Sequence, residues 1–444
     1  MTLEDDDEHA HGQTLDAPAL RVNAEDDERF GRGARAVFAL AVLLCAVLRL
    51  WRLNGSCLWF DELFGVHAAR HGWGGMFGFV VADIIHPPLF YVLLKLWIAL
   101  GGESLSWLRL LPALTAIATL VPFALLCREL RLRPVELNLA MLLFALNGYL
   151  IKYAQEVRMY SLLLFLAVCS LWIFVRYYNS PRVLKKHLAA LLSVNLLLVY
   201  THYYGWLLVA AQFVFLLIYA ARRKLLPFAG AICFVAVCFS PWAYAVAQAQ
   251  AAGHGLAQNI GWAVRPDASH VAQFYFTLNE ILYYVQSSNE RLYLRWSVVL
   301  GALVFGCPLV WYVWRTLRRT QDAANARALP WLVIFSVLPV ALAFLLSWIL
   351  PYSVWGTRHL IIIAAPYLIL CATALARLRP FWLRTTLLIL LGCWTLLSAT
   401  VLLVSRERNY VWCAWETLAR RAVESEPARD PPLKIYAFED LVAY

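Results

Sequence analysis

The stretch Leu105–Leu126, LSWLRLLPALTAIATLVPFALL, carries one charged side chain, Arg109. About 20 predominantly apolar residues are enough for a helix to cross roughly 30 Å of hydrocarbon, so this stretch is a candidate transmembrane span. Similar runs occur at 36–51, 226–247 and 383–404. The chain is 62% hydrophobic and 15% charged, which excludes an ordinary soluble globular domain. We therefore predict an all-α integral membrane protein.

The net charge of +10 comes from short basic clusters between the apolar runs. Such clusters are typical of cytoplasmic loops and not of a nucleic-acid-binding face, so we expect no nucleic-acid partner. Arg32 and Arg35 precede the first span, and they place the N-terminus in the cytoplasm. The predicted location is the plasma or inner membrane, with multiple passes. The clusters are Arg131 and Arg133, Lys185 and Lys186, Arg222 to Lys224, and Arg318 and Arg319.

The segment Pro87–Leu100 decides the topology. If it crossed the membrane, every later basic cluster would lie outside, against the positive-inside rule. It is also short for a span, so we interpret it as an interfacial helix in the first external loop. About eleven spans then remain, near 36–53, 105–127, 134–152, 158–178, 187–203, 205–221, 226–248, 296–315, 330–350, 358–378 and 381–404.

Three parts of the chain follow from this topology. Residues 1–35 are acidic and polar without the features of a signal peptide, and we expect a disordered cytoplasmic tail. Residues 36–404 form the transmembrane domain, with external loops at 54–104 and 249–295. Residues 405–444 form a short external tail. Among the ten cysteines, Cys57 and Cys413 lie outside the spans, and a disulfide between them stays open.

Two adjacent carboxylates, Asp61 and Glu62, follow the first span in the sequence Leu58-Trp59-Phe60-Asp61-Glu62. They can be solvated loop charges. Their apolar neighbours also suit a partly desolvated carboxylate, which is more basic and can accept a proton from a hydroxyl nucleophile.

The same loop ends Asp83-Ile84-Ile85-His86-Pro87-Pro88. The prolines suit a helix start, which leaves Asp83 and His86 to be explained. A hydrogen-bonded pair that fixes the loop is the interpretation we favour. A site for a divalent metal and a site for an acceptor substrate are alternatives with the same residue types. The sequence requires no cofactor.

Three further external turns carry polar residues. Glu156, Arg158 and Tyr160 lie in the turn Tyr153–Tyr160, His202 lies in Thr201–Tyr204, and Arg358 precedes a late span. Glu156 and Arg158 can form an interfacial ion pair, His202 can be a satisfied interfacial residue, and Arg358 can reach lipid headgroups. Arginine is also suited to a phosphate, because its planar fork donates two parallel hydrogen bonds.

These motifs, taken in order, resemble the polytopic GT-C glycosyltransferases. The pattern runs Trp-x-Asp-Glu, Asp-x-x-His-Pro-Pro-Leu-x-Tyr, Gln-Glu-x-Arg-Met-Tyr-Ser, Thr-His-Tyr-Tyr and a late Arg-His over about 54–366. The most similar groups are the protein O-mannosyltransferases, the lipid A aminoarabinose transferases and the galacturonosyltransferase-like enzymes. Where that family commonly has tyrosine after the late arginine, this chain has His359.

The resemblance implies a sugar donor on a polyprenyl phosphate and inverting transfer to an envelope glycan, lipid or protein at the outer face of the membrane. By similarity, Asp61 is the base, and Glu62 assists it or orients the acceptor. Asp83 and His86 shape the acceptor side or a metal site, Glu156 and Arg158 border the donor pocket, and Arg358 meets the lipid phosphate. Tyr160 and His202 are further candidate substrate-binding residues. The alternatives are a ligase or polymerase of lipid-linked glycans, and a transporter or flippase without chemistry.

Overall fold

The computed structural model describes residues 31–220, 222–253, 261, 263–282, 296–318, 325–404, 420, 421 and 424. Within these ranges the regular structure is helical, apart from one isolated bridge between Asn147 and Ile281. The helices are α1 (Arg32–Leu50), α2 (Phe60–Arg70), α3 (Trp73–Asp83), α4 (Leu89–Gly101), α5 (Leu105–Ala118), α6 (Leu120–Glu129), α7 (Pro134–Leu146), α8 (Gly148–Ala154), α9 (Tyr160–Asn179), α10 (Lys185–Thr201), α11 (Gly205–Tyr219), α12 (Arg222–Ala251), α14 (Ala268–Leu278), α15 (Trp296–Gly301), η3 (Ala302–Gly306), α16 (Cys307–Arg318), α17 (Asn325–Ile349), η4 (His359–Ile363), α18 (Ala364–Arg377) and α19 (Phe381–Val404).

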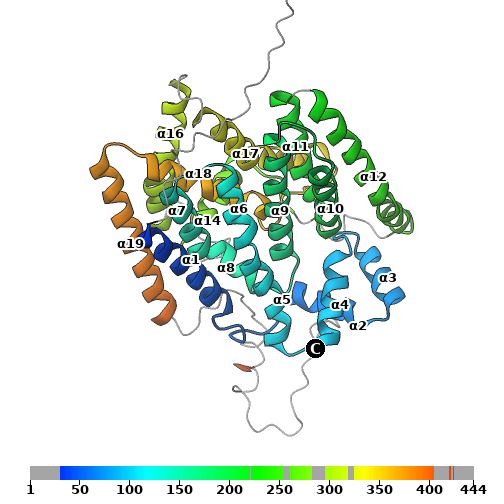
Figure 1. Cartoon of the computed structure of the whole chain (residues 1–444). Coiled ribbons are helices and arrows are strands. Elements are labelled where there is room, and N and C mark those ends of the chain that lie inside the picture. The colour runs from blue at the N-terminus through cyan, green and yellow to red at the C-terminus, as the bar shows by residue number, and fades with distance from the viewer. Residues whose placement is uncertain are drawn as a thin grey trace, which may run out of the picture.

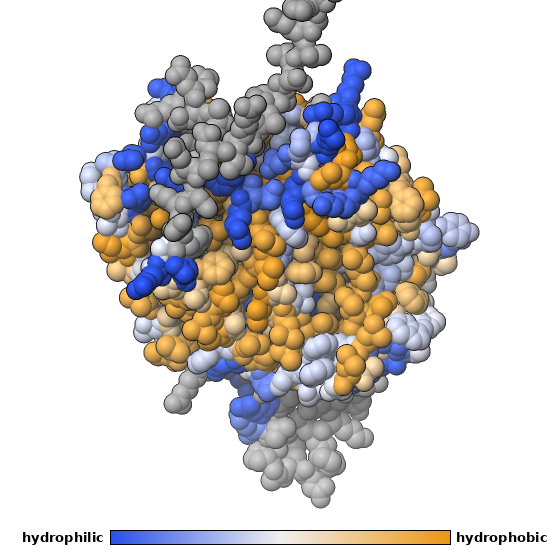
Figure 2. Space-filling view, in the orientation of Figure 1, coloured by the Kyte–Doolittle hydropathy of each residue, from blue (hydrophilic) through white to orange (hydrophobic). Residues whose placement is uncertain are grey.

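Each of the eleven expected spans has a helical counterpart (Figure 1). Eight helical segments of the described chain are long and apolar enough to cross a membrane. The other three expected crossings are α7 with α8, α10, and α11. Figure 2 shows a broad hydrophobic band across the middle of the molecule, with hydrophilic side chains gathered above it and a smaller group below. The structure is therefore an all-α polytopic membrane bundle, as predicted. Most of the two expected tails, 1–35 and 405–444, lies outside the described residues.

The helix α4 is too short to span. It has 13 residues, which corresponds to about 20 Å of α-helix against roughly 30 Å of hydrocarbon. It groups with α2 and α3 at the lower right of Figure 1 and packs against α2 and α5. This arrangement agrees with the interpretation of Pro87–Leu100 as a helix that stays at one end of the bundle.

A pair of tryptophans joins α4 to α5. The Trp97 and Trp107 rings stack with centroids 4.3 Å apart. Each indole N–H donates to the main-chain oxygen of the other residue, at 2.7 and 2.9 Å. A Cβ on Gly101 would lie 2.1 Å from the Trp107 ring. Only glycine fits at position 101, and the pair fixes the angle at which α4 meets α5.

The third expected span is broken at Asn147. Its side-chain oxygen accepts from the main-chain N–H of Leu150 at 2.9 Å and so caps α8. Its amide nitrogen donates to the main-chain oxygen of Leu278 at 2.7 Å. Phe274 and Leu278 of α14 are fully buried. Part of the segment 249–295, which was expected to be a loop outside the spans, is thus folded into the bundle beside this break.

The helix α18 is the centre of the bundle. Its span, which begins at η4, is the most buried of the eight, with 94% of its most apolar window inside the protein. It packs on α7, α16 and α17. The continuous segment of η4 and α18 begins just after Arg358 and ends at Arg377. It therefore connects the predicted site residue Arg358 at one end of the bundle with an ion pair of Arg377 and Glu136 at the other.

Cys57, the cysteine outside the spans that the structure describes, differs from the other described cysteines. Cys57 is disulfide-bonded, and the other eight cysteines of the described chain are free. Cys413, the partner considered from the sequence, lies outside the described residues.

Candidate active site

Asp61 and Arg358 are brought together from distant parts of the chain. Asp61 lies in the first turn of α2, where the partial positive charge of a helix N-terminus favours a carboxylate. Arg358 Nη1 donates to Asp61 Oδ2 at 2.9 Å, and the two side chains are 25% and 27% exposed. Within the described chain, no hydrogen bond reaches Asp61 Oδ1. The pair holds an oriented carboxylate with one oxygen available to a substrate.

Arg158 approaches the main chain of Asp61 from the turn before α9. Its Nη1 donates to the main-chain oxygen of Asp61 at 2.9 Å, and its Nη2 lies 3.5 Å from both ring nitrogens of His86. The residue is only 3% exposed. Among the described residues it forms no ion pair within 4.0 Å, and its Nε has no hydrogen-bond partner. The expected ion pair between Glu156 and Arg158 is therefore wrong.

Asp83 and His86 lie where α3 ends. Ile84 has φ 53° and closes the helix in the left-handed region, and α4 begins only after the two prolines. His86 Nδ1 lies 3.6 Å from Asp83 Oδ2, so the two side chains are adjacent but do not form the hydrogen bond we favoured from the sequence. Burial raises the pKa of Asp83 to about 6, although Arg158 opposes the shift. Burial and Arg158 lower the pKa of His86.

Three histidines meet beside this pair. His202 follows α10, His359 begins η4, and one ring nitrogen from each of His86, His202 and His359 lies within 4.8 Å of the others. The His202 and His359 ring centroids are 4.4 Å apart. The sequence indicated His86 and His202 separately and noted His359 only as a departure from a family pattern. Their meeting depends on the packing of α4, α10 and η4, and no sequence spacing reveals it.

Glu62 points into the protein. It is fully buried, and its carboxylate accepts from the main-chain N–H groups of Trp59 at 3.0 Å and Val157 at 2.8 Å. Arg109 Nη2 lies 3.4 Å from Oε2. Burial raises the pKa of Glu62 to about 7, against the opposing effect of Arg109. Glu62 thus ties the start of α2 to the turn before α9, the two segments that carry Asp61 and Arg158.

Glu156 and Tyr160 complete the wall of the site. Glu156 is fully buried, accepts from the Trp59 indole N–H at 3.2 Å and lies 3.8 Å from Lys152 Nζ. Tyr160 is 1% exposed, and its ring contacts His359 with centroids 6.0 Å apart. The sequence analysis did not select Trp59 or Lys152. A signal for Trp59 was present, because it opens the Trp-x-Asp-Glu motif.

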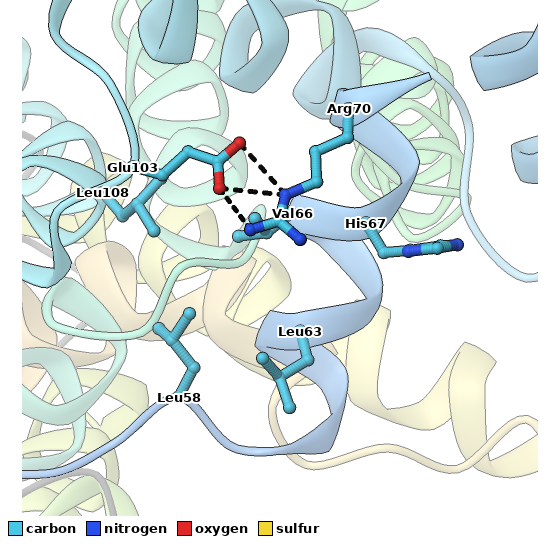
Figure 3. A pocket seen from close by; sticks show the side chains of 7 residues that line it. All are labelled: Leu58, Leu63, Val66, His67, Arg70, Glu103 and Leu108. Atoms are coloured by element: carbon cyan, nitrogen blue, oxygen red, sulfur yellow. Dashed lines mark hydrogen bonds and ion pairs between the residues drawn. The ribbon is translucent and has the colours of Figure 1, made fainter. Parts of the chain in front are cut away.

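A separate small pocket lies on the other side of α2. Its volume is about 140 Å³. Figure 3 shows Arg70 and Glu103 joined across it, and Arg70 Nε donates to the two Glu103 oxygens at 2.9 and 3.1 Å. Its α2 residues are spaced along the helix face opposite Asp61, so the pocket contains none of the predicted site residues. It is lined by Leu58, Leu63, Val66, His67, Arg70, Glu103 and Leu108.

Comparisons with known proteins agree on the fold. No protein-family model and no curated protein matches the sequence. The oligosaccharyltransferase AglB from Archaeoglobus fulgidus, solved with an inhibitory peptide and a dolichol-phosphate, matches with a TM-score of 0.51 and 15% identity over 89% of this chain and 58% of that one. ArnT from Cupriavidus metallidurans, bound to undecaprenyl phosphate, matches with a TM-score of 0.55 and 14% identity over 83% of this chain and 65% of that one.

The structure of ArnT in the apo state also matches, with a TM-score of 0.55 and 16% identity. The chain spans less than two thirds of the AglB chain and of the ArnT chain bound to undecaprenyl phosphate. At these identities the likeness concerns the fold. This chain has the GT-C fold of polytopic membrane glycosyltransferases, as its motifs predicted.

Proposed function

We propose that the chain is a membrane glycosyltransferase that moves a sugar from a polyprenyl-phosphate donor to an envelope glycan, lipid or protein, with Asp61 as general base. The observation that carries the proposal is the oriented, partly exposed Asp61 carboxylate, bonded to Arg358 at 2.9 Å and adjoined by the buried Arg158. A base beside two guanidinium groups is the combination that a hydroxyl nucleophile and a phosphate leaving group require.

The reaction is a single displacement. The acceptor oxygen forms a bond to the anomeric carbon while its proton passes to Asp61 Oδ1. The bond between the anomeric carbon and the phosphate oxygen breaks, and its electron pair leaves with the polyprenyl phosphate. Arg158 and Arg358 stabilise the negative charge on that phosphate. One displacement inverts the anomeric configuration.

Other residues position these groups. Glu62 holds the start of α2 against the turn at Val157, so it fixes Asp61 without touching the substrate. Glu156 and Tyr160 shape the donor side, while Asp83 and His86 border the acceptor side.

Two observations support the lipid donor and the outward orientation. AglB and ArnT, which share the fold, were solved with a dolichol-phosphate and undecaprenyl phosphate. Cys57, in the same loop as Asp61, is disulfide-bonded, and disulfides persist on the oxidising side of a membrane. The first supports a lipid-linked donor. The second favours an active site on the outer face of a plasma or inner membrane, and the basic residues before the first span favour a cytoplasmic N-terminus.

The test compares cells that express the wild-type chain, Asp61→Asn, or the control Glu103→Gln, whose carboxylate lies in the side pocket. Mass analysis of envelope glycans and lipid-linked sugars reports transfer. We expect Asp61→Asn to reduce transfer by about 10²- to 10⁴-fold with normal membrane insertion, and Glu103→Gln to behave as wild type. Full transfer by Asp61→Asn would sink the assignment of the base.

The same analysis separates the rival functions. A glycosyltransferase gives an acceptor that is one sugar heavier and a donor that accumulates in its absence. A ligase or polymerase gives acceptors heavier by whole oligosaccharide units. A transporter or flippase changes the side of the membrane on which a lipid-linked sugar is found and forms no covalent product.

A further inference from the structure

Ile84 has a strained backbone at the edge of the candidate site. Its φ of 53° lies in the left-handed region, where the Cβ of an L residue comes too close to the carbonyl oxygen that follows it. Four non-glycine residues of the described chain have a positive φ, and Ile84 is the β-branched one among them. The residue is only 1% exposed. A strained conformation of this kind persists only where the surrounding groups hold it.

Two hydrogen bonds in series hold this backbone conformation. The Tyr203 hydroxyl, in the turn between α10 and α11, donates to the main-chain oxygen of Ile84 at 3.0 Å. The Trp242 indole N–H, on α12, donates to the same hydroxyl at 3.1 Å. Because an indole N–H can only donate, the hydroxyl accepts from Trp242 and keeps its own proton for Ile84. Three segments that are distant in sequence thus meet at one peptide group.

That peptide group also acts on Asp83. Its oxygen belongs to Ile84 and its N–H to Ile85, and both lie in one plane. Burial raises the pKa of Asp83 to about 6, while Arg158 and the main-chain N–H of Ile85, which donates to the carboxylate, oppose the shift. Since the group is planar, the hydroxyl that fixes its oxygen also fixes the N–H that meets Asp83.

We infer that Tyr203 and Trp242 are positioning residues, which hold the strained backbone at Ile84 and so orient the acceptor side of the site. Their effect reaches Asp83 on one side of Ile84 and His86 on the other. The inference rests on the proposed function, because that function places these two side chains beside the acceptor. It also gives α12, which packs on α3 and α10, a part in acceptor binding.

The rival role for Tyr203 is purely structural, as a bond that joins neighbouring helices. The chain offers a matched control for that role. The Tyr200 hydroxyl donates to the main-chain oxygen of Cys238 at 2.7 Å and so joins α10 to α12 without contacting Ile84. Tyr200→Phe and Tyr203→Phe each remove one tyrosine hydroxyl that donates to the main chain. Only Tyr203→Phe releases the backbone at Ile84.

The test measures sugar transfer in membranes that contain the chain with its native donor and acceptor, and farnesyl phosphate binding by the purified protein. Tyr203→Phe and the control Tyr200→Phe are compared with wild type. Tyr203→Phe is then repeated in Ile84→Ala and Ile84→Gly backgrounds. Both backgrounds lose the buried side chain, but only glycine adopts a positive φ without strain.

We expect Tyr203→Phe to lower transfer by up to about tenfold, since the loss of one hydrogen bond reduces the population of the strained conformation by that factor. Tyr200→Phe should transfer like wild type. Farnesyl phosphate affinity should not change in either variant, because this probe reports on the donor side. Tyr203→Phe should cause a similar loss in the Ile84→Ala background and less than about a twofold loss in the Ile84→Gly background.

Amide hydrogen exchange of residues 84–86 gives a second measurement that needs no substrate. Exchange should be faster in Tyr203→Phe than in Tyr200→Phe. If Tyr203→Phe fails to fold, Trp242→Phe carries the same test, because it removes the donor that orients the hydroxyl. Equal losses of transfer in the alanine and glycine backgrounds would overturn the inference, and so would wild-type transfer by Tyr203→Phe. Faster exchange in Tyr203→Phe, with no sugar transfer by the wild-type chain, contradicts the proposed function alone.

Discussion

The two ends of the bundle hold a partly buried and a buried arginine in opposite states of pairing, Arg377 at one end and Arg158 at the other. At the end of α18, Arg377 Nε and Nη2 donate to both oxygens of Glu136 at 2.6 and 3.1 Å. Glu136 is fully buried and also accepts from the main chain and side chain of Arg133, at 3.1 and 2.8 Å. At the site end, Arg158 is buried without a carboxylate within 4.0 Å in the described chain.

The difference teaches how to separate structural from functional charges in this molecule. Removing a guanidinium from water is costly, and a bidentate carboxylate offsets the cost within the protein. The Glu136 cluster is complete and has no capacity for a ligand. The Arg158 cluster is incomplete, so an anion from outside can stabilise it. Variants in the Glu136 cluster should alter the free energy of unfolding. Variants around Arg158 should alter substrate binding or sugar transfer.

The largest effect is expected for Glu136→Ala. It removes the buried carboxylate that pairs with the partly buried Arg377 and the largely exposed Arg133, and breaking a buried ion pair costs up to about 3–5 kcal/mol. The free energy of unfolding in detergent should fall accordingly, while farnesyl phosphate affinity of the folded fraction stays normal. The control is Glu129→Ala, because Glu129 forms a partly exposed pair with Arg176 at 4.0 Å and should cost less than about 1 kcal/mol. Equal losses in both variants would contradict the comparison.

At the site end, Arg358→Gln removes the donor to Asp61 Oδ2 and a positive charge near the leaving group. We expect kcat/KM for transfer to fall by about 100-fold, which corresponds to about 2.7 kcal/mol. The melting temperature should change little, because the Arg358 side chain is 25% exposed. A much lower melting temperature, together with normal sugar transfer by the folded fraction, would show that Arg358 stabilises the fold and does not act in transfer.

Gly101→Ala tests the tryptophan pair without touching either charged cluster. The new methyl group would overlap the Trp107 ring, and overpacking of this kind costs about 1–3 kcal/mol. Thermal unfolding measures the loss. Gly78→Ala is the control, because nothing lies within 4 Å of a Cβ at that position of α3. If Gly101→Ala melts like Gly78→Ala, the pair does not fix α4 against α5.

The smallest effect concerns the pH dependence of stability through Glu62. Its pKa in the folded protein, about 7, is raised above the ordinary 4.5, so the unfolded state releases its proton first as the pH rises. Glu62 therefore destabilises the fold progressively between about pH 4.5 and 7. The melting temperature should decline by a few degrees over this interval, and Glu62→Gln should flatten the decline. An unchanged slope in Glu62→Gln would show that another group titrates.

Much of the fold could be predicted because a bilayer imposes strong rules. Apolar runs such as Leu105–Leu126 had to become helices, since backbone groups in hydrocarbon must be satisfied within the segment. The break at Asn147 and the insertion of α14 could not be predicted. They depend on side-chain contacts with Leu278, which is far away in sequence.

The candidate site was only partly predictable for the same reason. The motifs identified Asp61, Arg158 and Arg358 and their shared end of the bundle. They left open an ion pair of Glu156 with Arg158, whereas in the structure Glu156 lies beside Lys152. They also gave no indication that His202 and His359 would meet.

The sequence by itself determined the helices, the short α4 and the types of side chain that collect between spans, because hydropathy and charge act locally along the chain. The tertiary structure alone decided which arginine is paired and which is not. Arg377 and Arg158 both lie at ends of apolar helices, and nothing in their flanking residues separates them. The physical reason is that the pairing of a buried charge depends on which distant helix end packs beside it. Here Glu136 reaches Arg377, while Arg158 faces His86.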